Sequence, residues 1–71
     1  MRYTVIVEEG ATRWGAYLPD LPGCVAAGES REEVLRLIRE AMEFHLEGVS
    51  EQGQPVPEPH SHGEVVEIHA A

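Results

Sequence analysis

Residues 17–24 read Tyr17-Leu18-Pro19-Asp20-Leu21-Pro22-Gly23-Cys24, and this stretch divides the chain into two parts. Proline has no amide hydrogen to donate to a sheet ladder, so Pro19 and Pro22 exclude a central strand here. Pro22-Gly23 fits the centre of a type II turn, because proline fixes the first φ and glycine accepts a positive second φ. Asp20 can also hydrogen-bond the backbone just ahead of it. The stretch therefore predicts a stiff reversal between two strands.

Three strands are predicted before and after this reversal. Tyr3–Glu8 is rich in β-branched residues and largely apolar on both faces, which is typical of a central strand. Trp14–Leu18 is the second strand, reached through a polar connection in which Gly10 suits a hairpin. Cys24–Ala27 is a short third strand after the turn. Together the three strands predict an antiparallel meander.

A long helix is predicted from Arg31 to about Gln52. Ser30 and Glu33 form a capping box at its start, and Gly53 suits the position just after its end. Gly48 costs roughly 1 kcal/mol against alanine inside a helix, so an end at Gly48 is the alternative. An apolar stripe at helical spacing indicates one buried face. The stripe consists of Val34, Leu37, Ile38, Ala41, His45 and Val49, widened by Leu35, Met42 and Leu46.

The C-terminal part of the chain predicts a loop followed by a fourth strand. Residues 54–63 contain alternating prolines, which favour an extended path, and Glu64–His69 reads as a strand. A right-handed crossover through the helix would lay this strand parallel to the first. We expect one α+β domain over residues 1–71, of order β-β-β-α-β. Its four-stranded mixed sheet would have the order 3-2-1-4, with one long helix packed on one face.

Composition and charge narrow the classes of function. The chain has 71 residues and a formal net charge of −8. Binding to a phosphate backbone needs clustered Lys and Arg, so this charge argues against direct contact with nucleic acid. It suits a basic protein partner, and solubility alone also explains it. We expect a cytoplasmic protein, because the sequence contains no signal peptide and no apolar run of membrane-spanning length.

Several motifs resemble those of a known family. The run from Trp14 to Cys24, followed by Ser30 and Glu33 and by Gly53-Gln54-Pro55-Val56-Pro57-Glu58-Pro59, is similar to the HicB-like antitoxin family. The resemblance implies a truncated ribonuclease H-like fold and a protein that blocks a small basic RNase, the HicA-type toxin. Many members also carry a C-terminal DNA-binding segment. Since this chain ends directly after the expected fourth strand, we expect no C-terminal DNA-binding domain.

The C-terminal half of the helix is expected to need cover from another molecule. A helix of this length runs to roughly 33 Å, whereas a six-residue strand spans about 20 Å. The overhang predicts a homo-oligomer, a dimer or a tetramer. Trp14 and Tyr17 fall on opposite faces of the second strand, so one packs under the helix and the other points to the open face. The expected partner or oligomer interface consists of Trp14, Tyr17, Glu43, Phe44, Leu46, Glu47 and Val49.

Nucleophilic and nuclease chemistry have weak support in the sequence. Cys24 has no readable base partner and is expected to be a packing residue. Glu8 and Asp20 invite comparison with the carboxylates of ribonuclease H-like enzymes, but a two-metal site needs several acidic groups in one place. We therefore expect no catalytic residues and no enzymatic activity.

Three histidines near the C-terminus are candidate metal ligands. They are His60, His62 and His69, with Glu58 or Glu64 assisting. Histidines in a flexible, Pro-rich loop are more often solvated, so no metal site and no cofactor is expected. The expected function is that of an antitoxin-like binding module for a basic RNase. The alternatives are an orphan oligomeric domain without a toxin and, last, a ribonuclease H-like nuclease.

Overall fold

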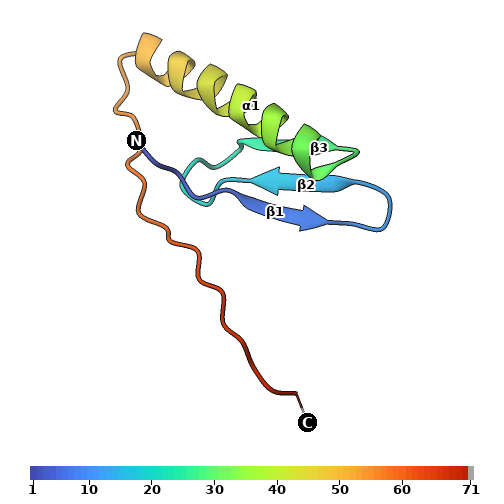
Figure 1. Cartoon of the computed structure of the whole chain (residues 1–71). Coiled ribbons are helices and arrows are strands. Elements are labelled where there is room, and N and C mark those ends of the chain that lie inside the picture. Colours follow the sequence, from blue (N-terminus) through green and yellow to red (C-terminus); the bar gives the residue numbers. More distant parts are fainter. Residues whose placement is uncertain (71) are drawn as a thin grey trace.

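The computed structural model of the chain describes residues 1–70. Strands β1 (Ile6–Glu9), β2 (Trp14–Tyr17) and β3 (Val25–Gly28) precede a single helix, α1 (Arg31–Glu51). The strands form an antiparallel sheet of order β1-β2-β3, and α1 lies along one face of it (Figure 1). The α+β class, the antiparallel meander and the long helix on one face are therefore as expected.

The predicted reversal between β2 and β3 is present. The amide of Leu21 donates to the carbonyl of Leu18 at 3.3 Å, and the amide of Cys24 donates to the carbonyl of Leu21 at 3.1 Å. Gly23 has a φ of +86°, the value that a type II turn requires at its second central position. Two consecutive tight turns thus carry the chain from β2 to β3.

Both ends of α1 are fixed by local hydrogen bonds. The Ser30 hydroxyl accepts the amide of Glu33 at 3.0 Å, and the Glu33 carboxylate accepts the amide of Glu29 at 3.1 Å. At the other end the amide of Gln54 reaches the carbonyl of Val49 at 3.1 Å, and Gly53 has a φ of +71°. This is a Schellman ending, so the helix passes through Gly48 and ends where Gly53 predicts.

The core lies between α1 and the sheet. Its fully buried side chains are Leu21, Ile38 and Val34. The remaining buried apolar residues are Ala16, Leu18 and Cys24. Leu21 belongs to the double turn, so the connection between β2 and β3 contributes directly to the core. Burying such side chains is the main stabilising term in a chain of this size.

A fourth strand is not present over Glu64–His69, and the sheet order is β1-β2-β3 rather than 3-2-1-4. Residues 64–70 instead lead away from the body of the molecule (Figure 1). Parallel pairing with β1, continued from the contact between Thr4 and Ser61, would bring Glu67 toward Glu8, and like charges on neighbouring strands are destabilising. The alternation of apolar and polar residues predicts a strand, but it does not identify another strand with which residues 64–69 would pair.

Within residues 1–70, α1 is the only helix, and it is too polar to cross a lipid bilayer.

Candidate functional site

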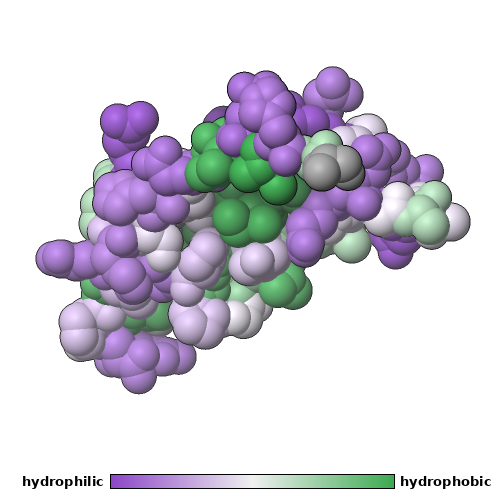
Figure 2. All heavy atoms as spheres, turned by 90° about the horizontal axis from the view of Figure 1, so that it is seen from below, coloured by the Kyte–Doolittle hydropathy of each residue, from purple (hydrophilic) through white to green (hydrophobic). Residues whose placement is uncertain are grey.

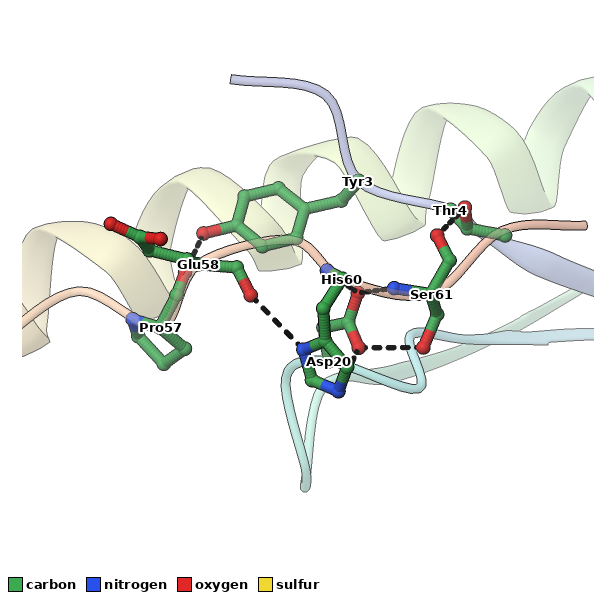
Figure 3. A network of polar contacts seen from close by, with 7 residues as sticks. All are labelled: Tyr3, Thr4, Asp20, Pro57, Glu58, His60 and Ser61. Atoms are coloured by element: carbon green, nitrogen blue, oxygen red, sulfur yellow. Dashed lines mark hydrogen bonds and ion pairs between the residues drawn. The ribbon is translucent and has the colours of Figure 1, made fainter.

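Asp20 joins the double turn to the C-terminal segment of the chain. Its side chain is only 1% exposed and accepts the amides of His60 at 3.0 Å and Ser61 at 2.9 Å, both at Oδ2. Oδ1 accepts the Ser61 hydroxyl at 2.7 Å and lies 3.2 Å from Nε2 of His60 (Figure 3). We call Asp20, His60 and Ser61 the carboxylate clamp. The sequence predicts a contact of Asp20 within its own turn and invites its comparison, with Glu8, to nuclease carboxylates, but it does not predict the contacts with His60 and Ser61.

These hydrogen bonds set the charge state of Asp20. They lower the pKa of the carboxyl from 3.8 to about 2; the Ser61 hydroxyl has the largest effect, and the amides of Ser61 and His60 and the nearby His60 ring add to it. Burial acts in the opposite direction but is outweighed. The clamp therefore holds an ionised carboxylate, whose interactions are stronger than those of a neutral acid.

A second set of contacts ties the same segment to the N-terminus. The Tyr3 hydroxyl donates to the carbonyl of Pro57, and the Thr4 hydroxyl donates to the carbonyl of Ser61 at 2.8 Å (Figure 3). Residues 57–61 thus run beside residues 3–4, just ahead of β1. The two sets of contacts fix the direction in which residues 64–70 leave the body.

A shallow groove of about 620 Å³ lies between α1, the start of β3 and the segment after the helix. Its walls include Val25, Ala41, Phe44, Val49 and Pro55. Phe44 is 80% exposed, and Val25 is also largely exposed. An exposed phenylalanine beside an apolar depression is a feature of protein-binding surfaces.

The residues predicted for an interface are divided between the core and the surface. Trp14 and Leu46 are half-buried and pack against the core, so their main role is to stabilise the fold. Tyr17 lies on the open face of the sheet and is exposed, in register with Ile6 and Val25. As expected, one of the two β2 aromatics packs under the helix and the other does not.

The helical part of the predicted interface is largely exposed. Glu43, Phe44 and Glu47 are exposed, and Val49 is half-buried in the wall of the groove. Figure 2 shows the molecule from below, on the side toward which residues 64–70 lead in Figure 1, with apolar side chains near the middle and polar side chains around them. Large apolar side chains are exposed on α1 (Phe44), on β2 and β3 (Tyr17 and Val25) and in the C-terminal segment (Val65, Val66 and Ile68).

The outward side of α1 is acidic over its C-terminal half. Glu43, Glu47 and Glu51 are exposed, whereas Glu40 is paired with Arg36 at 3.4 Å. No basic residue lies in the last turn of the helix. We call Glu43, Glu47 and Glu51 the acidic face. It carries uncompensated negative charge next to Phe44.

The candidate nuclease and metal residues are not brought together. Glu8 is exposed on β1, whereas Asp20 is buried in the clamp. Among residues 1–70, no three His, Cys, Asp or Glu side chains lie close enough to hold a metal ion. Cys24 is buried, and burial raises the pKa of its thiol, which favours the unreactive protonated form.

Comparison with known proteins identifies relatives over nearly the whole chain. Residues 3–69 match the sequence profile of a family described as the HicB-like antitoxin of bacterial toxin–antitoxin systems. An antitoxin named HicB 2 from Photorhabdus laumondii is 33% identical over 72 residues, covering 100% of this chain and 52% of the relative. An uncharacterised 14.9 kDa protein of Haemophilus phage HP1 is 33% identical over 57 residues, covering 80% of this chain and 43% of the phage protein.

Shorter relatives match as well. A UPF0150 protein of Thermoplasma acidophilum is 32% identical over 73 residues, covering 99% of this chain and 100% of the relative. This chain therefore spans about half the length of the first two relatives and the whole of the third. No solved structure matches the chain.

Proposed function

Because this chain belongs to the HicB-like antitoxin family of bacterial toxin–antitoxin systems, we propose that it neutralises a small basic RNase of the HicA type by covering its RNA-binding surface. A protein that holds RNA needs basic residues to contact phosphates. An acidic protein surface can compete for the same basic residues. In this mechanism the antitoxin binds and occludes but performs no chemistry.

The acidic face of α1 is the observation that carries this proposal. Glu43, Glu47 and Glu51 are exposed and have no basic neighbour in the last helical turn. Charge of this kind mainly raises the rate of association and affects the lifetime of the complex less.

Co-expression with the neighbouring gene product tests the proposal. A short adjacent reading frame that encodes a basic protein should arrest growth when expressed alone. Co-expression of this chain should restore growth, and the two proteins should purify together. If they purify separately and growth stays arrested, the antitoxin role is wrong and an orphan structural domain replaces it.

Charge reversal on the acidic face should weaken the complex in a defined way. In the double variant Glu43→Lys and Glu47→Lys, we expect association at low salt to slow at least tenfold while dissociation changes less, because exposed charges steer the encounter. Stopped-flow or surface-based kinetics at two salt concentrations measures both rates. Glu9→Lys with Glu58→Lys is the matched control, since it changes the net charge equally at exposed positions outside α1. Equal slowing by both pairs would contradict a specific acidic face.

We also propose that the chain acts in the cytoplasm as a homo-oligomer, a dimer or a tetramer. The exposed apolar side chains of Tyr17, Val25 and Phe44 support an assembly, because large exposed apolar groups usually mark contacts. Direct binding to nucleic acid is not part of the proposal, since the net charge of −8 opposes it.

A further inference from the structure

Residues 64–70 form an exposed, extended tail with the composition of a strand. Val65 is 100% exposed, Val66 is 77% exposed and Ile68 is 79% exposed. Figure 1 shows the tail leading away from the sheet and the helix, beyond the point at which the clamp holds Ser61. An extended segment of β-branched residues without a partner offers its backbone groups for pairing with another chain.

The two faces of the tail differ. Side chains alternate along an extended chain, so Val66 and Ile68 lie on one face, with Glu64 at its start, while Val65 and Glu67 lie on the other. The first face is therefore apolar over Val66 and Ile68, and the opposite face mixes apolar with charged groups. A strand of this kind suits a position with one side against a core and the other toward water.

The sheet has two free edges, and their charges distinguish them. β1 carries Glu8 and Glu9 at one edge, whereas β3, at the other, is Val25-Ala26-Ala27-Gly28. The tail is itself acidic through Glu64 and Glu67. Like charges on adjacent strands are destabilising, so the uncharged edge of β3 is the better acceptor. β3 also contains no proline or charged side chain that would protect it against pairing.

The groove beside β3 is lined by Phe44 and Val49 of α1 together with the polar residues His45, Gln52 and Gln54. Phe44 and Val49 supply its apolar surface. A strand added to β3 would bring one of its faces against this part of the helix. Six tail residues span about 20 Å at roughly 3.3 Å per residue, which is enough to cover four-residue β3.

We propose that residues 64–69 of one copy add as a fourth strand to the outer edge of β3 in a second copy, with Val66 and Ile68 in the groove beside Phe44 and Val49. The tail cannot serve its own β3 while it points away from the body. Two copies exchange tails reciprocally, so each donates one strand and accepts one. Such an exchange forms a closed dimer with two-fold symmetry, in which both tails and both β3 edges are paired.

This inference gives a contact to the homo-oligomer proposed above and does not depend on toxin binding. If the exchange is wrong but the antitoxin role is right, the tail variants below will still purify with the toxin. If the antitoxin role is wrong, the exchange will still be seen in the isolated protein.

Sedimentation of the full-length chain tests the role of the tail. The native chain should sediment at twice its mass of 7.8 kDa, and the variant Val66→Asp with Ile68→Asp should sediment as a monomer. Val65→Asp is the matched control, because it lies on the other face of the tail, and it should remain dimeric. Phe44→Asp should also be monomeric. A native monomer, or a double-Asp variant that remains a dimer, would overturn the proposal.

Mixing the two defective chains provides a test that misfolding cannot imitate. The double-Asp variant keeps a native groove, and Phe44→Asp keeps a native tail, so one of the two exchanged contacts can form in the mixture. A heterodimer should therefore appear when the two monomeric variants are combined. Its absence, with both variants folded by circular dichroism, would contradict reciprocal exchange.

Cross-linking identifies the edge that accepts the tail. In a Cys24→Ala background, a chain with Glu67→Cys is mixed with a chain carrying Ala27→Cys on β3 or Ile6→Cys on β1, and a short bismaleimide is added. The cross-link should form at least tenfold faster with Ala27→Cys than with Ile6→Cys. Preferential linkage to Ile6→Cys would assign the tail to β1 and overturn the proposal.

Discussion

Asp20 shows how one side chain can organise segments that are far apart in sequence. It lies between two prolines whose turn could be predicted, and the turn is present. Its partners are His60 and Ser61, which follow it by 40 and 41 residues. Local sequence patterns cannot predict these hydrogen bonds, because the residue spacing in the Pro-rich segment does not indicate which distant carboxylate it will contact. The only indication of these contacts in the sequence is the carboxylate of Asp20 itself, placed in a turn that its neighbouring prolines and Gly23 already specify.

The clamp should make stability depend on pH at the acidic end of the scale. Folding lowers the pKa of Asp20 from 3.8 to about 2, so the folded state binds its proton less readily than the unfolded state. The contribution of the clamp is therefore complete above pH 3.8 and is lost as the pH falls through about 2. Urea unfolding of the native chain and of Asp20→Asn between pH 2 and pH 6 measures it. The difference between the two should shrink toward pH 2, and a constant difference would contradict this assignment.

Two glycines should respond in opposite directions to the same substitution. Gly23 has a φ of +86°, where an L-residue is strained by about 1–2 kcal/mol, so Gly23→Ala should lower the free energy of unfolding by that amount. Gly48 is inside α1 with open space around its Cα, so Gly48→Ala should raise the free energy of unfolding by about 1 kcal/mol. Chemical denaturation compares the pair directly. Changes of the same sign would contradict the turn or the helix.

Among the elements, α1 supplies two of the buried core residues, Val34 and Ile38, and is also the longest. Its 21 residues extend about 32 Å at 1.5 Å per residue, whereas four-residue strands span about 13 Å. Val34 and Ile38 are buried near the sheet, and Phe44 further along the helix is exposed. The helix could be predicted well because its cap, its stripe and its glycine ending are all local features. That α1 extends beyond the sheet could be predicted from the lengths of the helix and the strands alone.

Truncation of the central helical contact should destabilise the fold strongly. Ile38 is only 1% exposed, and replacing a buried isoleucine with alanine costs about 2–5 kcal/mol. Arg39→Ala, at the next and exposed position, should change stability by less than about 0.5 kcal/mol. Urea denaturation followed by circular dichroism compares the two variants. Similar midpoints for both would mean that α1 does not bury this face.

The strands were harder to predict than the helix, and the reason is the need for partners. Tyr3–Val5 has the composition of a strand, yet β1 begins at Ile6, because residues 3–4 contact the C-terminal segment through side chains instead of pairing. Glu64–His69 likewise has strand composition without a ladder. A strand exists only where another backbone accepts its hydrogen bonds, and a single sequence does not name that backbone.

For the molecule as a whole, the two carboxylates that invite comparison with a nuclease lie in different environments. Glu8 is exposed on the sheet, and Asp20 has its hydrogen bonds filled by the clamp. We therefore expect no cleavage of labelled RNA or of an RNA–DNA hybrid, with or without Mg²⁺ or Mn²⁺. Metal-dependent cleavage that disappears in Glu8→Gln, a substitution at an exposed position, would show that the chain is a nuclease after all.

The contacts between residues 3–20 and residues 57–61 also impose an order on biosynthesis. Tyr3 and Asp20 leave the ribosome well before Pro57 and Ser61, so the carboxylate of Asp20 faces water until its partners have been made. The hydrogen bonds of Asp20 with His60 and Ser61 can form only when the C-terminal segment has emerged. Closing a loop of this length costs only slightly more entropy than closing a shorter one. A chain that stops before Ser61 would keep Asp20 at an apolar surface without its partners. Such a chain would lack the contacts that hold the C-terminal segment, and we expect proteases to cleave it more readily than the complete protein.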